Sequence, residues 1–435
     1  MAKNIVVIGT GYVGLVAAVG LADFGNRVIG VDIDKRKIET LKLGKSPIYE
    51  PGIEEYLNRN LKSGRLAFST DIDQAVQWAD VIFIAVGTPS REDGSADLSY
   101  LWSAAGTIAD NVNSYKVIVV KSTVPVGTNR KLQEFFDKKV GKGKVSVISN
   151  PEFLREGKAV YDFFHPDRVV VGYADKKARD IMVDIYEALY LNETPFIFSN
   201  WETAELIKYA SNAFLATKIT FINQMANLAE EVGADIHKIA KAMGMDGRIS
   251  PKFLHPGPGY GGSCFPKDTK ALVHMGKEVG VDMSLVREVI RANEMQKLRM
   301  VEKAERLLGS LQGKVVAVWG LAFKAETDDM RESPAIVIIN ELIKRGAKVK
   351  ATDPKAIENA KRVFGDKIAY FYDEFDAAKG SDMVIIVTEW NQYRNTDLEK
   401  LKKVMKGNVV LDARNVLDPE KVKKHGFVYE GVGRK

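Results

Sequence analysis

The feature that most constrains the fold is a glycine-rich turn that follows a short apolar run near the N-terminus. The run covers residues 4–8, Asn-Ile-Val-Val-Ile, and the turn that follows it reads Gly9-Thr10-Gly11-Tyr12-Val13-Gly14. An unbroken apolar run of this length is typical of a strand buried in a parallel sheet. A helical pattern then extends from Leu15 to about Phe24, and a second strand, Arg27 to Val31, ends at Asp32. This order of strand, glycine turn, helix, strand and acid is typical of a dinucleotide-binding fold.

The chemistry of a dinucleotide explains each part of this pattern. Glycines permit the tight turn and let a pyrophosphate approach the helix N-terminus, where free N–H groups and the helix dipole favour an anion. Asp32 is placed to accept hydrogen bonds from the ribose hydroxyls and to repel a 2′-phosphate. The sequence therefore predicts NAD as the cofactor. Three basic residues close to this acid leave NADP as the alternative: Lys35, Arg36 and Lys37.

Three further apolar runs follow at regular spacing, and each leads into polar residues. The runs are Val81–Val86, Val117–Val120 and Val145–Ile148, and the polar residues beyond them include Thr88, Thr123 and Glu152. In open α/β sheets, ligands bind beyond the carboxyl ends of the strands. We therefore expect these three side chains at a binding site, although such residues are also common in ordinary loops.

The stretch from Trp201 to Val232 contains neither glycine nor proline. Its pattern predicts one helix, which at 1.5 Å per residue would be about 45 Å long. A helix of this length can join two domains and offer a face to a second subunit. Lys208 and Asn212 are four residues apart and so project from one face, among apolar neighbours. A partly desolvated lysine and a lysine that extends its ammonium group to solvent are both compatible with this spacing.

The pattern of the N-terminal region returns after about Ser310. Four later runs match the earlier strands in order: Lys314–Trp319, Val349–Asp353, Asp382–Thr388 and Val409–Arg414. The first turn of this second copy keeps one glycine, Gly320, and has Lys324 nearby, which favours holding a phosphate by charge over binding a dinucleotide. We therefore predict an α/β protein in which two Rossmann-like doubly wound domains are joined by a long central helix. The expected division is a dinucleotide-binding domain over residues 1–200, a central helical domain with a dimer interface over 201–300, and a second Rossmann-like domain over 301–435.

The only cysteine in the 435 residues lies in a second glycine-rich stretch. Residues 257–268 read Gly-Pro-Gly-Tyr-Gly-Gly-Ser-Cys-Phe-Pro-Lys-Asp. Glycines remove Cβ atoms where a ligand could lie against the backbone. Lys267 and Asp268 follow Cys264 closely, and a nearby cation favours the nucleophilic thiolate. The alternative is a buried structural cysteine beside a surface Lys-Asp pair.

Composition disfavours several other classes of protein. A single cysteine excludes internal disulfides and fits a reducing compartment. The chain enters a strand directly and has no apolar run long enough to span a membrane, so we expect a cytoplasmic protein with no membrane partner. The net charge of +6 is mild, which disfavours nucleic-acid binding but is compatible with an anionic substrate. The histidines are scattered, so no metal site is predicted: His165, His237, His255, His274 and His425.

Three motifs together carry a family resemblance. They are the run from Gly261 to Asp268, the run from Asn150 to Gly157 (Asn-Pro-Glu-Phe-Leu-Arg-Glu-Gly), and Phe323-Lys324 with Arg331-Glu332-Ser333. In these motifs the chain resembles the UDP-glucose/GDP-mannose dehydrogenase family, over essentially its whole length from the first strand to Arg414. The branch that acts on UDP-glucose is the most similar, on the evidence of Ser263 before the cysteine, Phe265, the Lys267–Asp268 pair and the Lys252-Phe253-Leu254 segment.

The resemblance implies an NAD-dependent four-electron oxidation of UDP-glucose to UDP-glucuronate, with two NAD per turnover. It implies that Cys264 adds to an intermediate aldehyde, that the thiohemiacetal is oxidised to a thioester, and that water hydrolyses the thioester. The domain over residues 301–435 would bind the UDP-sugar.

The resemblance also implies roles for five further catalytic residues. Lys208 and Asn212 would stabilise the oxyanions that form at the reacting carbon. Asp268, with an ordered water, would remove a proton. Glu152 would be the base for hydrolysis, and Thr123 would orient the water that it activates.

Two sets of binding residues follow from the same resemblance. Around NAD it places Gly9, Gly11, Tyr12, Val13, Gly14, Asp32, Lys37, Thr88, Thr123, Glu156, Lys267 and Arg331. Around the UDP-sugar it places Glu152, Phe153, Leu154, Arg155, Glu156, Lys208, Asn212, Arg248, Phe253, Leu254, His255, Pro256, Gly257, Gly261, Lys324 and Arg414. Arg248 resembles an arginine that reaches the substrate of a neighbouring subunit, so we expect a homodimer or a higher homo-oligomer.

Three alternatives remain open from the sequence. The same chemistry could act on another nucleotide sugar, GDP-mannose or UDP-N-acetylmannosamine. A two-electron dehydrogenase of similar build, acting on a hydroxy acid, would not need Cys264. A non-catalytic nucleotide sensor would not need Lys208, Glu152 or Asp268.

Overall fold

The computed structural model describes residues 2–434, and their contacts divide the chain into two compact units. Unit 1 runs to Ser211 and also includes His274–Val281, and unit 2 comprises Asn212–Val273 and the chain from Asp282 onward. The three predicted domains, with boundaries at residues 200 and 300, are defined by their expected functions and not by contacts. That division stays a prediction.

Unit 1 is built on an eight-stranded sheet with the order β3-β2-β1-β4-β5-β6-β7-β8. Its strands are β1 (Asn4–Ile8), β2 (Arg27–Val31), β3 (Leu66–Ser69), β4 (Val81–Ile84), β5 (Lys116–Val120), β6 (Val145–Ser149), β7 (Val169–Gly172) and β8 (Phe196–Ser199). Neighbouring strands are parallel except β6 and β7. Ile8 of β1 lies opposite Val31 of β2 and Ile84 of β4, so the carboxyl ends of these strands meet at one edge of the sheet.

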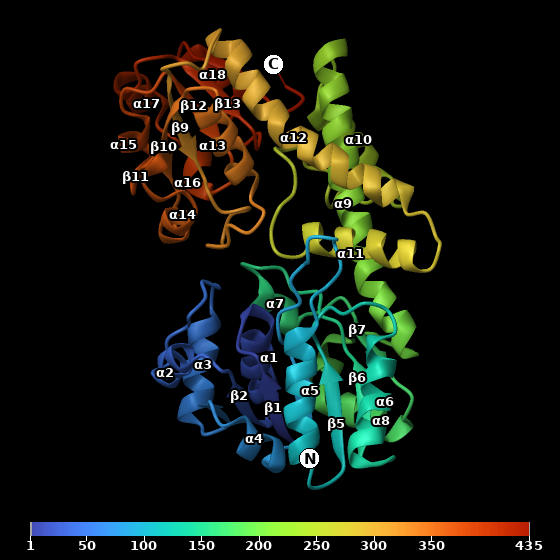
Figure 1. Cartoon of the computed structure of the whole chain (residues 1–435). Helices are drawn as coiled ribbons and strands as arrows, with labels where there is room; N and C mark the ends of the chain where they lie inside the picture. The colour runs from blue at the N-terminus through green and yellow to red at the C-terminus, as the bar shows by residue number, and fades with distance from the viewer. Residues whose placement is uncertain (1, 435) are drawn as a thin grey trace. The chain divides into compact units, whose positions relative to one another are not determined.

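Helices cover both faces of this sheet (Figure 1). They are α1 (Tyr12–Asp23), α2 (Lys35–Lys42), α3 (Ile53–Lys62), α4 (Ile72–Trp78), α5 (Ser99–Asn111), α6 (Thr128–Val140), α7 (Ala159–Phe164), α8 (Lys176–Ile185) and the short 3-10 helix η1 (Glu187–Asn192). Ile5 and Val7 of β1 belong to the core that contains α1, whereas Val6 and Ile8 belong to the core that contains α5. Because successive side chains alternate between the faces, a strand covered on both faces has to be apolar throughout.

Unit 2 repeats the arrangement in a six-stranded, wholly parallel sheet with the order β11-β10-β9-β12-β13-β14. Its strands are β9 (Val315–Trp319), β10 (Lys348–Thr352), β11 (Ala369–Phe371), β12 (Met383–Ile386), β13 (Val409–Asp412) and β14 (Val428–Gly431). The helices around it are α13 (Pro334–Lys344), α14 (Ile357–Phe364), η2 (Gly365–Lys367), α15 (Glu374–Ala378), α16 (Asn391–Arg394), α17 (Leu398–Val404) and α18 (Pro419–Lys424). Counted from its own first strand, this sheet has the order 3-2-1-4-5-6, as do the first six strands of unit 1.

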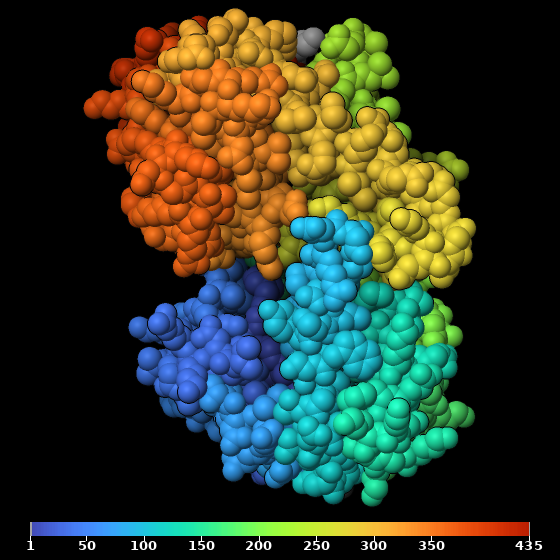
Figure 2. Space-filling view, viewed as in Figure 1, coloured from blue at the N-terminus to red at the C-terminus, as the bar shows by residue number. Residues whose placement is uncertain are grey.

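The predicted long helix is confirmed as α9 (Trp201–Val232), a single helix of 32 residues that enters both units. It is the long green helix of Figure 1. The other central helices are α10 (Ile236–Met245), α11 (Phe265–Glu278) and α12 (Ser284–Leu308). Much of α12, coloured yellow to gold, lies at the surface of unit 2 on the face shown in Figure 2. The predicted fold class, two doubly wound domains joined by a long helix, is confirmed.

Several predicted boundaries differ from the structure by one to three residues. Helix α1 begins at Tyr12, three residues before its predicted start, because Gly11 already takes the N-cap position. Strand β4 ends at Ile84, two residues early, since the Val86 carbonyl accepts a hydrogen bond from the Ser122 hydroxyl at 2.6 Å. Strands β12 and β13 likewise end two residues before their predicted limits. Within residues 2–434, no helix combines the length and apolar character that crossing a membrane requires.

Candidate functional site

The glycine turn after β1 has the geometry that a dinucleotide-binding turn requires. Gly9 has a φ of +91°, and a Cβ on it would lie 2.7 Å from the carbonyl oxygen of Ala85. A Cβ on Gly14 would lie 1.8 Å from the carbonyl oxygen of Gly9. At Gly11, the N-cap of α1, a Cβ would meet no atom within 4 Å. The fold itself therefore requires Gly9 and Gly14, whereas Gly11 leaves the helix N-terminus open to an anion.

The acid at the end of β2 is held by several donors. Asp32 Oδ2 accepts hydrogen bonds from the Thr10 N–H, the Thr10 hydroxyl and Lys37 Nζ, each at 2.9 Å. Asp32 Oδ1 accepts one from the Asp34 N–H at 3.1 Å. Burial raises the pKa of Asp32, but the hydrogen bonds from Lys37, Asp34 and Thr10 outweigh burial and hold that pKa below its ordinary value. The sequence pattern did not predict the contact with Thr10.

This ionised carboxylate is expected to make NADP a poor cofactor. Repulsion between Asp32 and a 2′-phosphate about 4 Å away is of the order of 4 kcal/mol in a partly screened site, and Lys37 offsets part of it. We expect kcat/KM for NADP to lie at least about a hundredfold below that for NAD. Asp32→Ser should narrow this ratio, whereas equal values for the two cofactors in the wild type would contradict the assignment. Initial rates measured with each cofactor give the ratio of the two kcat/KM values.

Further predicted cofactor residues of unit 1 lie in the segments that follow β1, β4, β5 and β6. The hydroxyl of buried Thr88 donates to the Thr123 carbonyl at 2.9 Å, which joins the loops after β4 and β5. Tyr12 Oη accepts a hydrogen bond from the Gly157 N–H at 2.7 Å, so the start of α1 contacts the segment after β6. Val13 and Glu156 are half-buried.

Glu152 and Lys208 form a buried ion pair in unit 1. Lys208 Nζ donates to Glu152 Oε1 at 3.1 Å, and the Leu154 N–H donates to Oε2 at 2.6 Å. The side chains of Lys208 and Glu152 are only 4% and 6% exposed, so a lysine that extends to solvent is the wrong interpretation. Burial raises the pKa of Glu152, but Lys208 and the Leu154 N–H outweigh burial and hold it below its ordinary value. The pair places a carboxylate base and a cation beyond the end of β6.

The residues after Glu152 have separate environments. The Phe153 ring lies 3.6 Å from Arg168 Cζ and 5.3 Å from Lys208 Nζ, measured to its centroid. Leu154 packs against the core of unit 1. Arg155 is exposed, and its guanidinium binds both oxygens of Asp162.

A second buried pair forms in unit 2, one helical turn further along α9. Asn212 Nδ2 donates to Asp268 Oδ2 at 2.6 Å, and Lys267 Nζ donates to Asp268 Oδ1 at 2.5 Å. The Asp268 N–H donates to the Cys264 carbonyl at 2.8 Å, at the beginning of α11. Cys264 is half-buried, and its Sγ lies 3.5 Å from the Ser263 hydroxyl. Cys264 therefore directly precedes α11, and Asp268 in the first turn of that helix is bound by the Asn212 amide of α9.

Side-chain amides from two helices hold the glycine loop before Cys264. Asn223 of α9 accepts the Gly257 N–H at 2.8 Å, and Gln296 of α12 donates to the Gly257 carbonyl at 2.9 Å. Asn293 of α12 accepts the Tyr260 N–H at 2.8 Å and donates to the Tyr260 carbonyl at 3.1 Å. The amides supply the partners that buried backbone groups need, and so fix the path of the loop. None of the three was predicted.

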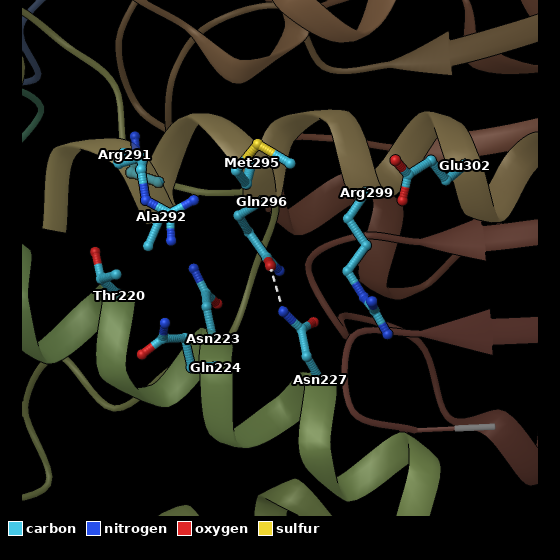
Figure 3. Close-up of a pocket in the computed structure, with 11 residues that line it drawn as sticks. Thr220, Asn223, Gln224, Asn227, Arg291, Ala292, Met295, Gln296, Arg299 and Glu302 are labelled. Carbon is cyan, nitrogen blue, oxygen red and sulfur yellow. Dashed lines mark hydrogen bonds between the residues drawn. The ribbon is translucent and has the colours of Figure 1, made fainter. Parts of the chain in front are cut away.

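A cavity of about 260 Å³ lies between α9 and α12 beside this loop, and Figure 3 shows its lining. Asn223 and Gln296 form part of its wall, and Asn227 Nδ2 donates to Gln296 Oε1 at 2.9 Å. Asn227 thus supports the amide that holds Gly257, and none of the predicted site residues lines the cavity.

Several predicted substrate residues of unit 2 lie together around the glycine loop. A Cβ on Gly257 would lie 3.3 Å from Arg414 Nη1, and Arg414 Nη2 donates to the Phe323 carbonyl at 2.8 Å. A Cβ on Gly261 would lie 2.3 Å from the carbonyl oxygen of Glu332. Close approach of two backbones is therefore the reason for glycine at position 261, whatever ligand binds nearby.

The segment before this loop contributes both core and surface residues. Phe253 has a φ of +65°, an uncommon conformation for a bulky residue, and its ring centroid lies 6.2 Å from that of Phe265. Leu254 belongs to the core of unit 2, and Pro256 is buried. His255 between them is exposed.

Three predicted basic residues have their own local partners. Lys324 is half-buried, with its Nζ 5.4 Å from the centroid of the neighbouring phenylalanine ring. Arg331 binds Asp329 through Nε and Nη2 at 2.7 to 2.9 Å. Arg248 has a side chain that is 90% exposed and is paired with Asp246. Arg248 is therefore available at the surface of unit 2.

The residues present fit a dinucleotide. The open N-terminus of α1 suits a pyrophosphate, and the ionised Asp32 suits ribose hydroxyls. No group of three or more His, Cys, Asp and Glu side chains within residues 2–434 is arranged to hold a metal ion.

Comparisons with known proteins give one consistent family. Three domain models of the UDP-glucose/GDP-mannose dehydrogenase family match: the NAD binding domain over residues 3–190, the central domain over 202–295 and the UDP binding domain over 317–419. The chain is 48% identical to UDP-glucose 6-dehydrogenase of Rhizobium meliloti (strain 1021), with 99% of each chain covered. It is 46% identical to UDP-glucose 6-dehydrogenase TuaD of Bacillus subtilis (strain 168), with 99% of this chain and 93% of the relative covered.

Solved structures agree with these relatives. A UDP-glucose dehydrogenase from the hyperthermophilic archaeon Pyrobaculum islandicum matches with a TM-score of 0.94 and 42% identity, over 100% of this chain and 98% of that one. A UDP-D-ManNAc dehydrogenase from Pyrococcus horikoshii matches with a TM-score of 0.88 and 27% identity, over 99% of each chain.

Proposed function

Because the chain belongs to the UDP-glucose/GDP-mannose dehydrogenase family, with an NAD binding and a UDP binding domain, we propose that it oxidises C6 of UDP-glucose to the carboxylate of UDP-glucuronate. The reaction consumes two NAD per turnover and passes through covalent intermediates on Cys264. NAD, when bound, accepts a hydride in each oxidation.

The observation that carries this proposal is the presence of two buried pairs on consecutive turns of α9. Lys208 binds Glu152, and Asn212 binds Asp268, whose N–H bonds the Cys264 carbonyl. A single hydride transfer to or from a hydroxy acid needs neither a thiol nor a hydrolytic base. Four-electron oxidation with hydrolysis needs both, together with donors for the oxyanions.

The oxidation steps assign roles to the residues of unit 2. Asp268 removes the proton of the C6 hydroxyl through a water as the hydride leaves C6, which gives the aldehyde. The Cys264 thiolate adds to the aldehyde carbon and forms a thiohemiacetal, as its oxyanion. Loss of a second hydride from that carbon gives the thioester. Asn212, together with Lys208 on the preceding turn of α9, donates to the oxyanion that forms at each stage.

Hydrolysis assigns roles to the residues of unit 1. Glu152 accepts a proton from the attacking water, and Thr123 orients that water. Lys208 stabilises the tetrahedral oxyanion, for which it has to move its ammonium group from Glu152 toward the substrate oxygen. The carboxylate product then leaves with the thiolate restored.

The second candidate function is the same chemistry on another nucleotide sugar, GDP-mannose or UDP-N-acetylmannosamine. The structural match to a UDP-D-ManNAc dehydrogenase is the observation that favours it. The higher identity to two UDP-glucose 6-dehydrogenases supports UDP-glucose.

One assay separates these candidates. NADH formation is measured with UDP-glucose, GDP-mannose and UDP-N-acetylmannosamine at limiting sugar. We expect turnover with UDP-glucose, about two NADH per sugar and no free aldehyde, because the aldehyde is captured by Cys264. One NADH per sugar would contradict the four-electron reaction, and preference for another sugar would establish the second candidate.

We also propose a homodimer or a higher homo-oligomer. Arg248 is exposed and resembles an arginine that contacts the neighbouring subunit's substrate. Large apolar side chains recur every seven residues on the exposed side of α9, at Phe214, Phe221 and Leu228, and such a stripe suits a helical partner. Light scattering at the assay concentration tests this, and a fully active monomer would exclude it.

A further inference from the structure

Lys121, the first residue after β5, is a buried lysine with no role in the reaction proposed above. Its Nζ donates to Asn150 Oδ1 at 3.1 Å and lies 3.4 Å from Tyr186 Oη. Lys121 precedes Thr123 by two residues, and Asn150 precedes Glu152 by two. The lysine therefore connects the ends of β5 and β6, two residues before the proposed catalytic residues Thr123 and Glu152.

The hydrogen bonds alone do not require a lysine at this position. Tyr186 Oη also donates to Asn150 Oδ1, at 2.9 Å, and Asn150 Nδ2 donates to the Val170 carbonyl at 2.9 Å. Asn150 would keep a partner at each end of its amide without Lys121. A buried ammonium group is costly unless another charge compensates it, so its presence here points to an electrostatic role.

The charged and titratable groups that face Lys121 come from three segments. Glu152 follows β6 and attracts the ammonium group, Lys208 of α9 repels it, and Tyr186 follows α8 and contacts it. Burial lowers the pKa of Lys121 to about 8, against the attraction of Glu152. Lys121 is thus mostly protonated at pH 7, and its charge in turn helps to lower the pKa of Glu152.

Lys208 has two binding partners in the proposed reaction, and it cannot bind both at once. In the structure it binds Glu152 Oε1, whereas in the proposed hydrolysis it stabilises the oxyanion on the substrate. A carboxylate as buried as Glu152, once its cation turns away, would tend to take up a proton and cease to be a base. A second cation that cannot reach the substrate would prevent this.

We propose that Lys121 is a positioning residue that keeps Glu152 ionised while Lys208 is engaged with the reacting oxygen, and that hydrolysis of the acyl-enzyme depends on it. The inference rests on the proposed function. In the step concerned, the water oxygen bonds to the thioester carbon and the water proton passes to Glu152. The carbon–sulfur bond then breaks, and its electron pair leaves on the Cys264 sulfur.

The test compares four variants of the full-length protein. Lys121→Met and Lys121→Gln lack the charge, and the glutamine retains a donor for Asn150. Lys121→Arg keeps the charge, and Tyr186→Phe is the matched control that removes only the neighbouring hydroxyl. After rapid mixing with UDP-glucose and NAD, intact-protein mass spectrometry follows the decay of the acyl-enzyme at each pH, and the NADH burst reports the hydride transfers.

The rate of acyl-enzyme hydrolysis should fall at low pH, where Glu152 becomes protonated, and we call this part of the pH–rate profile the acid limb. We expect the midpoint of the acid limb to move up by about one pH unit in both neutral variants, because loss of a neighbouring cation raises the pKa of Glu152. On that limb, hydrolysis should slow about tenfold, while the NADH burst keeps its wild-type rate. Lys121→Arg and Tyr186→Phe should retain the wild-type limb.

Stability distinguishes this role from a structural one. Burial holds the pKa of Lys121 in the folded protein below its ordinary value of 10.5, so between the two values the unfolded chain binds the additional proton. The charge therefore weakens the fold at neutral pH, and this weakening fades as the pH rises toward 10.5. We expect Lys121→Met to have a Tm at pH 7 equal to or above that of the wild type.

Two results would overturn the inference while leaving the proposed function intact. One is an acid limb that does not move in the neutral variants, with or without a loss of Tm. The other is a limb that moves as far in Lys121→Arg as in Lys121→Gln. Failure of the wild type to release two NADH per UDP-glucose would instead overturn the proposed function itself.

Discussion

Replacement of Cys264 by serine is expected to stop the enzyme as a covalent ester after a single turnover. The serine hydroxyl can still add to the aldehyde, and hydride loss from the hemiacetal then gives an oxyester. Hydrolysis of that ester expels an alkoxide, a poorer leaving group than the thiolate of a residue whose ordinary pKa is about 8.5. NADH formation should therefore end at about two per active site, with the UDP-glucuronyl group retained on the protein.

Intact-protein mass spectrometry, followed by peptide mapping, locates this adduct. Glu152→Gln is the complementary variant and should accumulate the thioester on Cys264, the only cysteine of the chain. Cys264→Ala is the control that can form neither adduct. If Cys264→Ala retained wild-type turnover to UDP-glucuronate, the aldehyde hydrate would be the species oxidised, and the covalent mechanism would be wrong.

The two sheets show what local sequence can predict about this fold. Burial on both faces requires an unbroken apolar run, and that requirement makes β1 and its counterpart β9 recognisable in the sequence. Strand ends are less predictable because tertiary contacts decide them. The Val86 carbonyl is bound by the hydroxyl of Ser122, which lies 36 residues away, and no local pattern encodes that contact.

Some residues of the candidate site could likewise be predicted from local sequence, and others could not. Gly9 and Gly14 could be predicted because the turn has no room for a Cβ, and Cys264 because a lone thiol in a glycine loop is chemically distinctive. Asn223 and Gln296 could not be predicted, since a polar side chain on a helix does not reveal its partner. Their contacts with Gly257 span 34 and 39 residues. The role of Lys121 could not be predicted for the same reason.

Lys208→Ala is expected to lower kcat by at least about a hundredfold with little change in KM for UDP-glucose, the scale of losing one oxyanion donor. The substitution also lowers kcat for a second reason, because Lys208 compensates the buried charge of Glu152. Removing one partner of a buried ion pair costs about 3–5 kcal/mol of stability. The variant should therefore also have a lower Tm, and the pKa of Glu152 should rise.

A double variant separates these two reasons for the lower kcat. Lys208→Ala combined with Glu152→Gln leaves no uncompensated carboxylate, so its Tm should recover toward that of Glu152→Gln alone. If Lys208 acts on the oxyanions, the NADH burst of the double variant should stay about a hundredfold slower than that of Glu152→Gln, because the hydride transfers do not need the hydrolytic base. Equal bursts in the double variant and Glu152→Gln would mean that the lysine serves only Glu152. A rise in KM with an unchanged kcat in Lys208→Ala would make it a substrate clamp, since an interaction lost equally from the ground and transition states changes KM alone.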